Sequence, residues 1–212
     1  MNTISASECI KFGWDTFKKR PLMIIGGFLL AMIVSGIIQS LLSPDQNAAV
    51  SASSVALSLI SAAVGILVEM GLVTFSLRVH DSVESVKIQD LWNPKPFMRY
   101  LIGQILVGVI VIIGLILLIV PGVIAALALM FTSYLIIDKG RNPLEAIKES
   151  FRITKGHRMQ LFILVVALIG INLLGAIALL VGLIVSIPVS MLAIVHAYRK
   201  LEHSSAEMVA SV

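Results

Sequence analysis

Apolar residues fill three long stretches of this chain, and short segments rich in charge separate them. The stretches are Pro21–Leu77, Tyr100–Asp138 and Met159–Tyr198. One membrane crossing needs about 20 helical residues, because a helix rises about 1.5 Å per residue and the hydrocarbon core is about 30 Å thick. Each stretch therefore accommodates two spans, and the pattern predicts six transmembrane helices arranged as three hairpins.

Polar or helix-breaking residues inside the stretches predict where each hairpin turns. Ser43–Ser54 is polar and separates the first two spans. In the second stretch we expect the turn at Pro121 and Gly122, since proline breaks the helical hydrogen-bond ladder and glycine tolerates positive φ. The helix after Gly122 is short, so we expect it to begin below the outer membrane surface. The third turn is expected near Gly182, with Pro188 kinking the last helix.

Basic residues lie at only one end of the predicted spans. All 16 Lys and Arg fall in four clusters, and none falls in the turns within the stretches. Because positive charge stays on the cytoplasmic side during insertion, each stretch must leave that side and return to it. We therefore expect both termini in the cytoplasm and the protein in the bacterial inner membrane. The clusters are Lys11–Arg20, Arg78–Arg99, Lys139–Arg158 and Arg199–Lys200.

Composition places the chain in the same class. Hydrophobic residues make up 58% and charged residues 13%, whereas about a quarter of a soluble domain is charged. The isoelectric point near 9.4 follows from the cationic loops, which can interact with anionic lipid headgroups. The chain has no basic motif with interleaved aromatic residues, so we expect no nucleic-acid partner. The expected fold class is all-α, a polytopic membrane helix bundle, with residues 1–212 forming a single integral membrane domain.

A short amphipathic segment precedes the third stretch. Asn142 is a typical N-cap, Pro143 suits the first helical position and Gly156 ends the helix. Apolar side chains recur at helical spacing on one face of this segment, and charged side chains occupy the others. The apolar set is Leu144, Ile147 and Phe151, and the charged set is Glu145, Lys148, Glu149, Arg152 and Lys155.

The first segment repeats this pattern at an offset of 137 residues, so that Ser5 matches Asn142 and Trp14 matches Phe151. Ser85–Trp92, before the second stretch, is a weaker copy. Two interpretations are open: a triplicated unit with repeats 5–81, 82–141 and 142–200, or convergence of unrelated interfacial helices. In both we expect the helices to lie flat on the cytoplasmic surface and contact anionic headgroups. The expected lipid contacts are Lys11, Lys18, Lys148, Arg152 and Lys155.

From Phe97 to Tyr198 the chain resembles the YciC-like family and the membrane domain of bacterial glycerophosphoryl diester phosphodiesterases. The resemblance implies a polytopic bacterial membrane protein of a kind that mostly lacks an assigned activity. The phosphodiesterase activity of those enzymes belongs to a separate soluble barrel with metal-binding acidic residues, which this chain lacks, so that activity is not expected. The motifs that carry the resemblance are Pro121-Gly122, Asp138-Lys139-Gly140, Glu145-Ala146-Ile147-Lys148-Glu149-Ser150 and Thr154-Lys155-Gly156.

Glu69 is the clearest polar signal inside a predicted span. A carboxylate at that depth is costly unless it is protonated, paired or hydrated, so we expect Glu69 to face the bundle rather than lipid. Gln104 on the next span is its expected partner, and Asn172 lies deep in the fifth span. These residues form a candidate intramembrane polar site. They belong either to a proton- or cation-responsive pathway or to hydrogen bonds that hold helices together.

No set of residues in the sequence indicates catalysis. No HExxH motif or Cys/His spacing is present, and the segments between spans are too short to fold into a catalytic domain. We read Asp81 and Glu84 as part of a solvated loop. We expect no enzyme activity, no cofactor and no metal. The four histidines, all near basic ends of spans, are His80, His157, His196 and His203.

Two functions compete. The favoured one is a scaffold, an envelope-maintenance factor or a partner-binding subunit of the inner membrane, because the loops are short and catalytic groups are lacking. The alternative is a small transporter or lipid-handling protein that uses Glu69 in an intramembrane polar pathway; a continuous wet cavity reaching Glu69 would favour it. The expected partners are membrane lipids with anionic headgroups, and the sequence leaves open a membrane-protein partner or a homo-oligomer.

Overall fold

The computed structural model describes residues 4–42, 51–178 and 181–210, with side chains described as far as Ser205. Every regular element within these ranges is a helix. Six spans are long and apolar enough to cross a membrane, which confirms the predicted number and indicates a multi-pass membrane protein. The spans are α2 (Pro21–Leu42), α3 (Ala52–Asp81), α4 (Phe97–Leu117), α5 with α6 (Ile119–Leu129 and Thr132–Lys139), α8 (Arg158–Ile177) and α9 (Leu183–Ala210).

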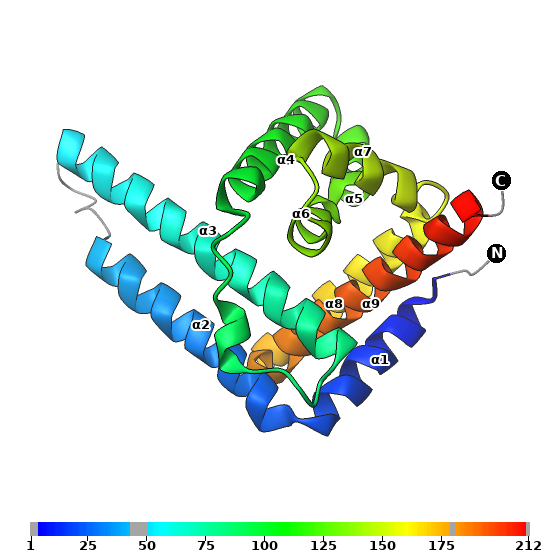
Figure 1. Cartoon of the computed structure of the whole chain (residues 1–212), viewed down its shortest axis with the longest axis horizontal. Coiled ribbons are helices and arrows are strands. Elements are labelled where there is room, and N and C mark those ends of the chain that lie inside the picture. The colour runs from blue at the N-terminus through cyan, green and yellow to red at the C-terminus, as the bar shows by residue number, and fades with distance from the viewer. Residues whose placement is uncertain (1–3, 43–50, 179–180, 211–212) are drawn as a thin grey trace.

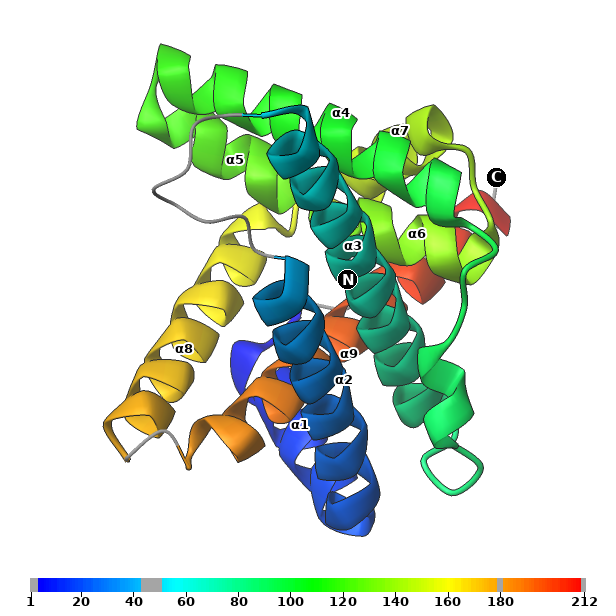
Figure 2. The ribbon, with the colours of Figure 1, turned by 90° about the vertical axis from the view of Figure 1, so that its left-hand side faces the viewer.

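Consecutive spans lie beside one another, and the resulting pairs point in different directions from a common centre (Figures 1 and 2). α2 contacts α3, α4 contacts α5 and α8 contacts α9. The last part of α3 contacts both α6 and α9, and Tyr198 of α9 packs against Phe131 and Tyr134 beside them. The remaining elements, α1 (Ala6–Lys19), α7 (Pro143–Thr154) and the 3-10 turn η1 (Ile88–Leu91), pack around these spans.

Burial is concentrated where the pairs converge. In α3 the buried residues run from Met70 to Val79, whereas most of residues 52–60 are exposed. α4 buries only Tyr100 and Gly103, both near its beginning. The far halves of these helices are apolar and contact mainly the paired helix beside them, so the rest of their surface is exposed, as expected for surfaces that contact lipid.

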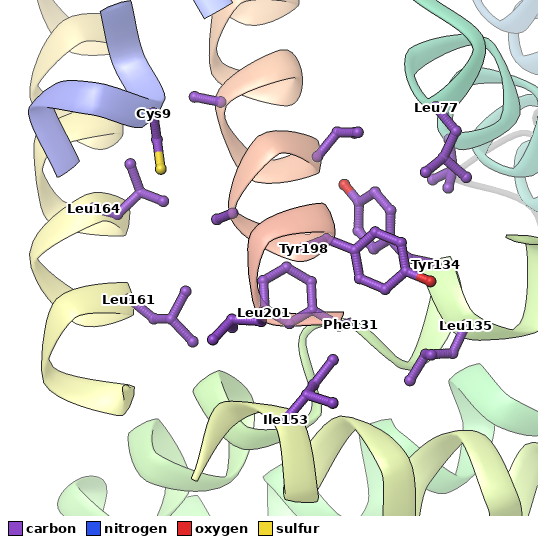
Figure 3. Close-up of a cluster of buried hydrophobic side chains, with 14 of the residues drawn as sticks. Cys9, Leu77, Phe131, Tyr134, Leu135, Ile153, Leu161, Leu164, Tyr198 and Leu201 are labelled. Carbon is purple, nitrogen blue, oxygen red and sulfur yellow. The ribbon is translucent and has the colours of Figure 1, made fainter. Parts of the chain in front are cut away.

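The main hydrophobic core joins α1, α6, α8 and α9 (Figure 3). Cys9 of α1 lies beside Leu164 of α8, and Phe131, Tyr134 and Tyr198 form a group of aromatic rings whose centroids lie 5.5–6.0 Å apart. Such separations are typical of favourable aromatic pairs. α1 approaches α9 closely at Gly13, where a Cβ atom would lie 2.6 Å from the carbonyl oxygen of Val189. The chain preceding the first span is therefore part of the core.

α1 and α7 bury corresponding positions. Each helix buries four residues, and each residue of one set lies 137 positions from its counterpart in the other, the same offset that relates their sequence patterns. This agreement accords with the repeat hypothesis, although the threefold repeat stays a prediction. The pairs are Cys9 and Ala146, Gly13 and Ser150, Thr16 and Ile153, and Phe17 and Thr154.

The packing face of α7 is not the apolar face that the sequence indicated. Leu144 and Phe151 are exposed, while Ser150 and Thr154 are fully buried. The prediction that an amphipathic helix precedes every pair is wrong for the second pair, where the chain forms only the four-residue turn η1. Small and hydroxylated residues allow close helix approach, so α7 packs through Ala146, Ser150 and Thr154 together with Ile153 and leaves Leu144 and Phe151 outside.

The prediction that Pro121 and Gly122 form the turn of the second pair is also wrong. α4 ends at Leu117, Leu118 alone is extended, and α5 begins at Ile119. Pro121 occupies the first turn of α5, where its missing N–H removes no helical hydrogen bond. Gly122 permits contact between the two helices, because a Cβ atom there would lie 2.5 Å from Leu115.

Two other turns can be compared with expectation. The predicted turn in Ser43–Ser54 falls largely outside the described residues, since 43–50 are not among them. Near the third turn, Gly182 packs against Gly175 of α8, and Pro188 lies inside α9 as expected. An interruption that was not predicted divides the fourth span at Met130 and Phe131, between α5 and α6.

The burial of Cys9 predicts slow alkylation. Cys9 is fully buried, and this burial raises the pKa of its thiol to about 11. Since the thiolate is the reactive form, we expect maleimide to label the folded protein at least tenfold more slowly than the denatured protein at pH 7.5. A Cys9→Ala, Lys11→Cys variant, with its thiol on the exposed face of α1, is the control. Equal labelling rates in the wild-type protein and this control would contradict the packing of α1.

Candidate functional site

The structure brings Glu69 and Gln104 together. Nε2 of Gln104 donates a hydrogen bond of 2.9 Å to Oε1 of Glu69, and the hydroxyl of Ser133 donates one of 3.4 Å to Oε1 of Gln104. The expectation that Glu69 faces the bundle is wrong, however, because its side chain is exposed on α3. Glu69 lies at the edge of the region where the helix pairs converge, one residue before Met70, the first buried residue of α3.

Asn172 does not belong to the same site. Its oxygen accepts a hydrogen bond of 2.7 Å from Ser186, and its nitrogen donates bonds of 3.0 Å to Ser190 and 2.9 Å to the Leu168 carbonyl. The two bonds to Ser186 and Ser190 join α8 to α9, whereas Glu69 and Gln104 join α3 to α4. The three predicted residues thus form two separate interhelical contacts.

The five basic residues expected to contact lipid are all exposed. Two of them form local ion pairs: Lys18 with Asp15 at 2.9 Å and Arg152 with Glu149 at 2.6 Å. Exposed pairs of this kind contribute little stability, so both cations remain able to interact with anions. Lys11, Lys148 and Lys155 complete the set.

The strongest polar site lies where α3, α6 and α9 meet. Arg199 of α9 bridges two carboxylates: it donates bonds of 2.6 and 3.0 Å to Asp81, and bonds of 2.7 and 2.9 Å to Asp138. The side chains of Arg199 and Asp138 are only 13% and 15% exposed. A planar guanidinium suits this double role, because its five N–H groups can serve two carboxylates at once. Each of the three returning helices therefore contributes one charge to a shared contact, named here the Arg199 bridge.

Further ion pairs extend the Arg199 bridge. The Tyr198 hydroxyl donates a bond of 3.0 Å to Asp138, Lys139 pairs with Glu202 at 2.9 Å, and Lys200 pairs with Glu8 at 2.6 Å. The Lys200 contact ties α1 to α9 and holds the pKa of the Glu8 carboxyl below its usual range.

Two histidines, His80 of α3 and His196 of α9, lie beside the Arg199 bridge. Nε2 of His80 lies 3.2 Å from Nδ1 of His196, and the His196 ring stacks on Phe12 with centroids 4.0 Å apart. Nδ1 of His80 lies 3.1 Å from Asp81. A hollow of about 320 Å³ adjoins them, lined by both histidines with Glu8, Arg199, Lys200, His203 and Ser204.

Sequence reasoning missed this site because it treated Asp81 as part of a solvated loop. That interpretation is wrong, because Asp81 accepts two hydrogen bonds from Arg199. A signal was present, since the three returning spans end in Asp81, Asp138 and Arg199, but nothing in their spacing shows that the ends converge. Chemically, the two carboxylates are already engaged by a guanidinium. Within the described residues, no group of three His, Cys, Asp or Glu side chains is arranged to hold a metal ion.

A second buried site explains the interruption between α5 and α6. The hydroxyl of Ser150 accepts a hydrogen bond of 3.2 Å from the N–H of Phe131 and donates one of 2.9 Å to the carbonyl of Ala128. A break leaves backbone groups without helical partners. Ser150 of α7 therefore caps both sides of the break from a different helix. Thr154 lies 3.2 Å from the same carbonyl, although its shorter bond of 2.8 Å is to Ser150 in its own helix.

Comparison with known proteins gives similar chains without an assigned activity. The chain is 26% identical over 131 residues to the uncharacterized protein Rv2560 of Mycobacterium tuberculosis and to the uncharacterized protein Mb2590 of Mycobacterium bovis. Each alignment covers 62% of this chain and 40% of the relative, so the chain spans about two-fifths of their length. No solved structure matches.

A family model matches residues 98–205, which include Asp138, Ser150 and Arg199. This range nearly coincides with the region that resembles YciC-like proteins, and the match is consistent with that resemblance. A relation to glycerophosphoryl diester phosphodiesterases is not shown. The chain belongs to the family described as Protein of unknown function (DUF975).

Proposed function

We propose that this chain is a non-enzymatic scaffold of the bacterial inner membrane, which binds a partner membrane protein. The observation that carries the proposal is the Arg199 bridge. It places the chain's most extensive polar contacts between α3, α6 and α9, where they hold three spans together. Carboxylates that already accept bonds from a guanidinium are suited to structural cohesion and poorly suited to proton transfer.

In this proposal the basic ends of the spans face the cytoplasm. The positive-inside rule supports that orientation, since all 16 Lys and Arg lie in segments at these ends. Both termini are then cytoplasmic, and α1 and α7 lie at the headgroup region. Exposed Trp14 and Phe151 suit that depth, because aromatic rings favour the membrane interface.

The scaffold proposal is tested by photo-crosslinking in native membranes. A photoreactive amino acid replaces Trp14, which is 45% exposed on α1, and a second variant carries it at Leu173, exposed on the far half of α8. We expect a protein adduct of one defined mass from position 14 and lipid adducts from position 173. Lipid adducts alone at both positions would contradict partner binding through α1.

Glu69 distinguishes the scaffold from a proton-linked transporter. Glu69→Gln retains an oxygen that can accept the bond from Gln104, so we expect its melting temperature to match the wild type. Glu69→Ala removes the acceptor and should destabilise the protein by about 0.5–1.5 kcal/mol. The measurements are thermal unfolding in detergent and proton uptake by proteoliposomes containing a pH-sensitive dye. Proton uptake by the wild type that Glu69→Gln abolishes would establish the transporter instead.

A further inference from the structure

A groove between α5 and α8 has the chemistry of a lipid site. Its volume is about 520 Å³, within the roughly 300–1,000 Å³ range of small-molecule sites. Its lining is apolar along α5 and carries one cation, Arg158, where α8 begins. The lining residues are Ile119, Val120, Val123, Ile124, Leu127, Arg158, Met159 and Phe162.

Arg158 has no anionic partner among the described residues. Nε and Nη2 of its guanidinium are buried and form no hydrogen bond. The guanidinium lies over the ring of Phe151, 4.3 Å from its centroid, which stabilises the charge but supplies no acceptor. Arg158 is also the first residue of α8, where the helix dipole adds positive potential.

Other buried polar atoms beside Arg158 also have no partner. Within the described part of the chain, five buried side-chain atoms form no hydrogen bond, and four of them belong to His157, Arg158 and Gln160. Buried donors and acceptors are nearly always paired in folded proteins. Of these residues only Arg158 lines the groove, so the two unpaired N–H groups of its guanidinium are the donors that a polar ligand in the groove would satisfy.

We propose that this groove binds one anionic phospholipid, with its phosphate on Arg158 and an acyl chain along α5. A guanidinium recognises phosphate through two parallel N–H bonds, for which Nε and Nη2 are both available. The apolar lining matches the acyl chain of such a ligand, and the exposed Lys155 nearby adds attraction for a negative headgroup. This site differs from general headgroup attraction at α1 and α7 because it is saturable and requires both the cation and the groove.

The test is lipid retention by the purified full-length protein. The protein is delipidated in detergent and titrated with phosphatidylglycerol, and bound lipid is counted by native mass spectrometry. We expect one tightly bound lipid in the wild type and a tenfold or greater loss of affinity in Arg158→Gln. Lys95→Gln, which removes an exposed cation from the loop before α4 and outside the expected lipid contacts, is the matched control and should change affinity by less than twofold.

Three further measurements separate the parts of the site. Ile124→Trp fills the groove and should weaken binding while Arg158 is retained. Phosphatidylcholine should bind at least tenfold more weakly than phosphatidylglycerol, and glycerophosphoglycerol, which lacks acyl chains, should not compete. Melting temperatures measured without lipid identify any variant that fails to fold. If Arg158→Gln does not fold, Arg158→Lys, which keeps the charge but lacks the planar fork, replaces it in the titration. Unchanged lipid affinity in Arg158→Gln, or equal binding of the two phospholipids, overturns the proposal.

Discussion

Arg199→Gln is expected to destabilise the protein by about 3 kcal/mol, the lower end of the range for breaking a buried ion pair. The substitution leaves Asp81 and Asp138 facing one another without their shared cation. Most of the loss comes from Asp138, whose side chain is 15% exposed, because Asp81 is 47% exposed and solvent partly compensates it. Arg199→Lys should be intermediate, since an ammonium group lacks the planar fork that engages two carboxylates.

Arg78→Gln is the matched control for this prediction. Arg78 is an exposed cation in the last turn of α3, close to Asp81. Its loss changes the net charge and the positive-inside asymmetry by as much as the loss of Arg199 does. Adding Asp138→Asn to Arg199→Gln should recover part of the lost stability, because it removes the more buried of the two carboxylates that have lost the guanidinium. The measurement is thermal unfolding in detergent, followed by size-exclusion chromatography. If Arg199→Gln and Arg78→Gln have the same melting temperature, the Arg199 bridge does not hold the spans together.

Ser150→Ala is expected to destabilise the protein by about 1–3 kcal/mol, the penalty for leaving a buried backbone group unpaired. One hydroxyl serves both the N–H of Phe131 and the carbonyl of Ala128, so its loss exposes both sides of the α5–α6 break. Thr154→Val should have a smaller effect, because the shorter bond of Thr154 lies within its own helix.

Ser76→Ala is the matched control for Ser150→Ala. Both serines are fully buried, but Ser76 donates only to the Leu72 carbonyl in its own helix. We expect Ser76→Ala to lower the melting temperature by less than half as much as Ser150→Ala does. Faster amide hydrogen exchange near Phe131 in Ser150→Ala, without a similar change in Ser76→Ala, would locate the effect at the break. Equal effects of the two variants would show that Ser150 acts only by filling space.

The candidate site was predictable only in part. The pairing of Gln104 with Glu69 followed from sequence, since both residues lie in the halves of adjacent spans that are nearer to their basic ends. The exposure of Glu69 did not follow, because it depends on how far the helix pairs diverge. The cap formed by Ser150 was also not predictable: a serine on a polar helix face indicates solvent until the partner of that face is known.

The lengths of the apolar stretches and the charge asymmetry alone determined the number of spans and the class of protein. A membrane requires about 20 apolar residues per crossing, and this requirement is local in the sequence. The contacts between spans were decided only by the tertiary structure, which brings Asp81, Asp138 and Arg199 together. The spans are similarly apolar, so hydrophobicity favours no particular arrangement among them. A few polar and small residues select the arrangement, and their partners are remote in sequence.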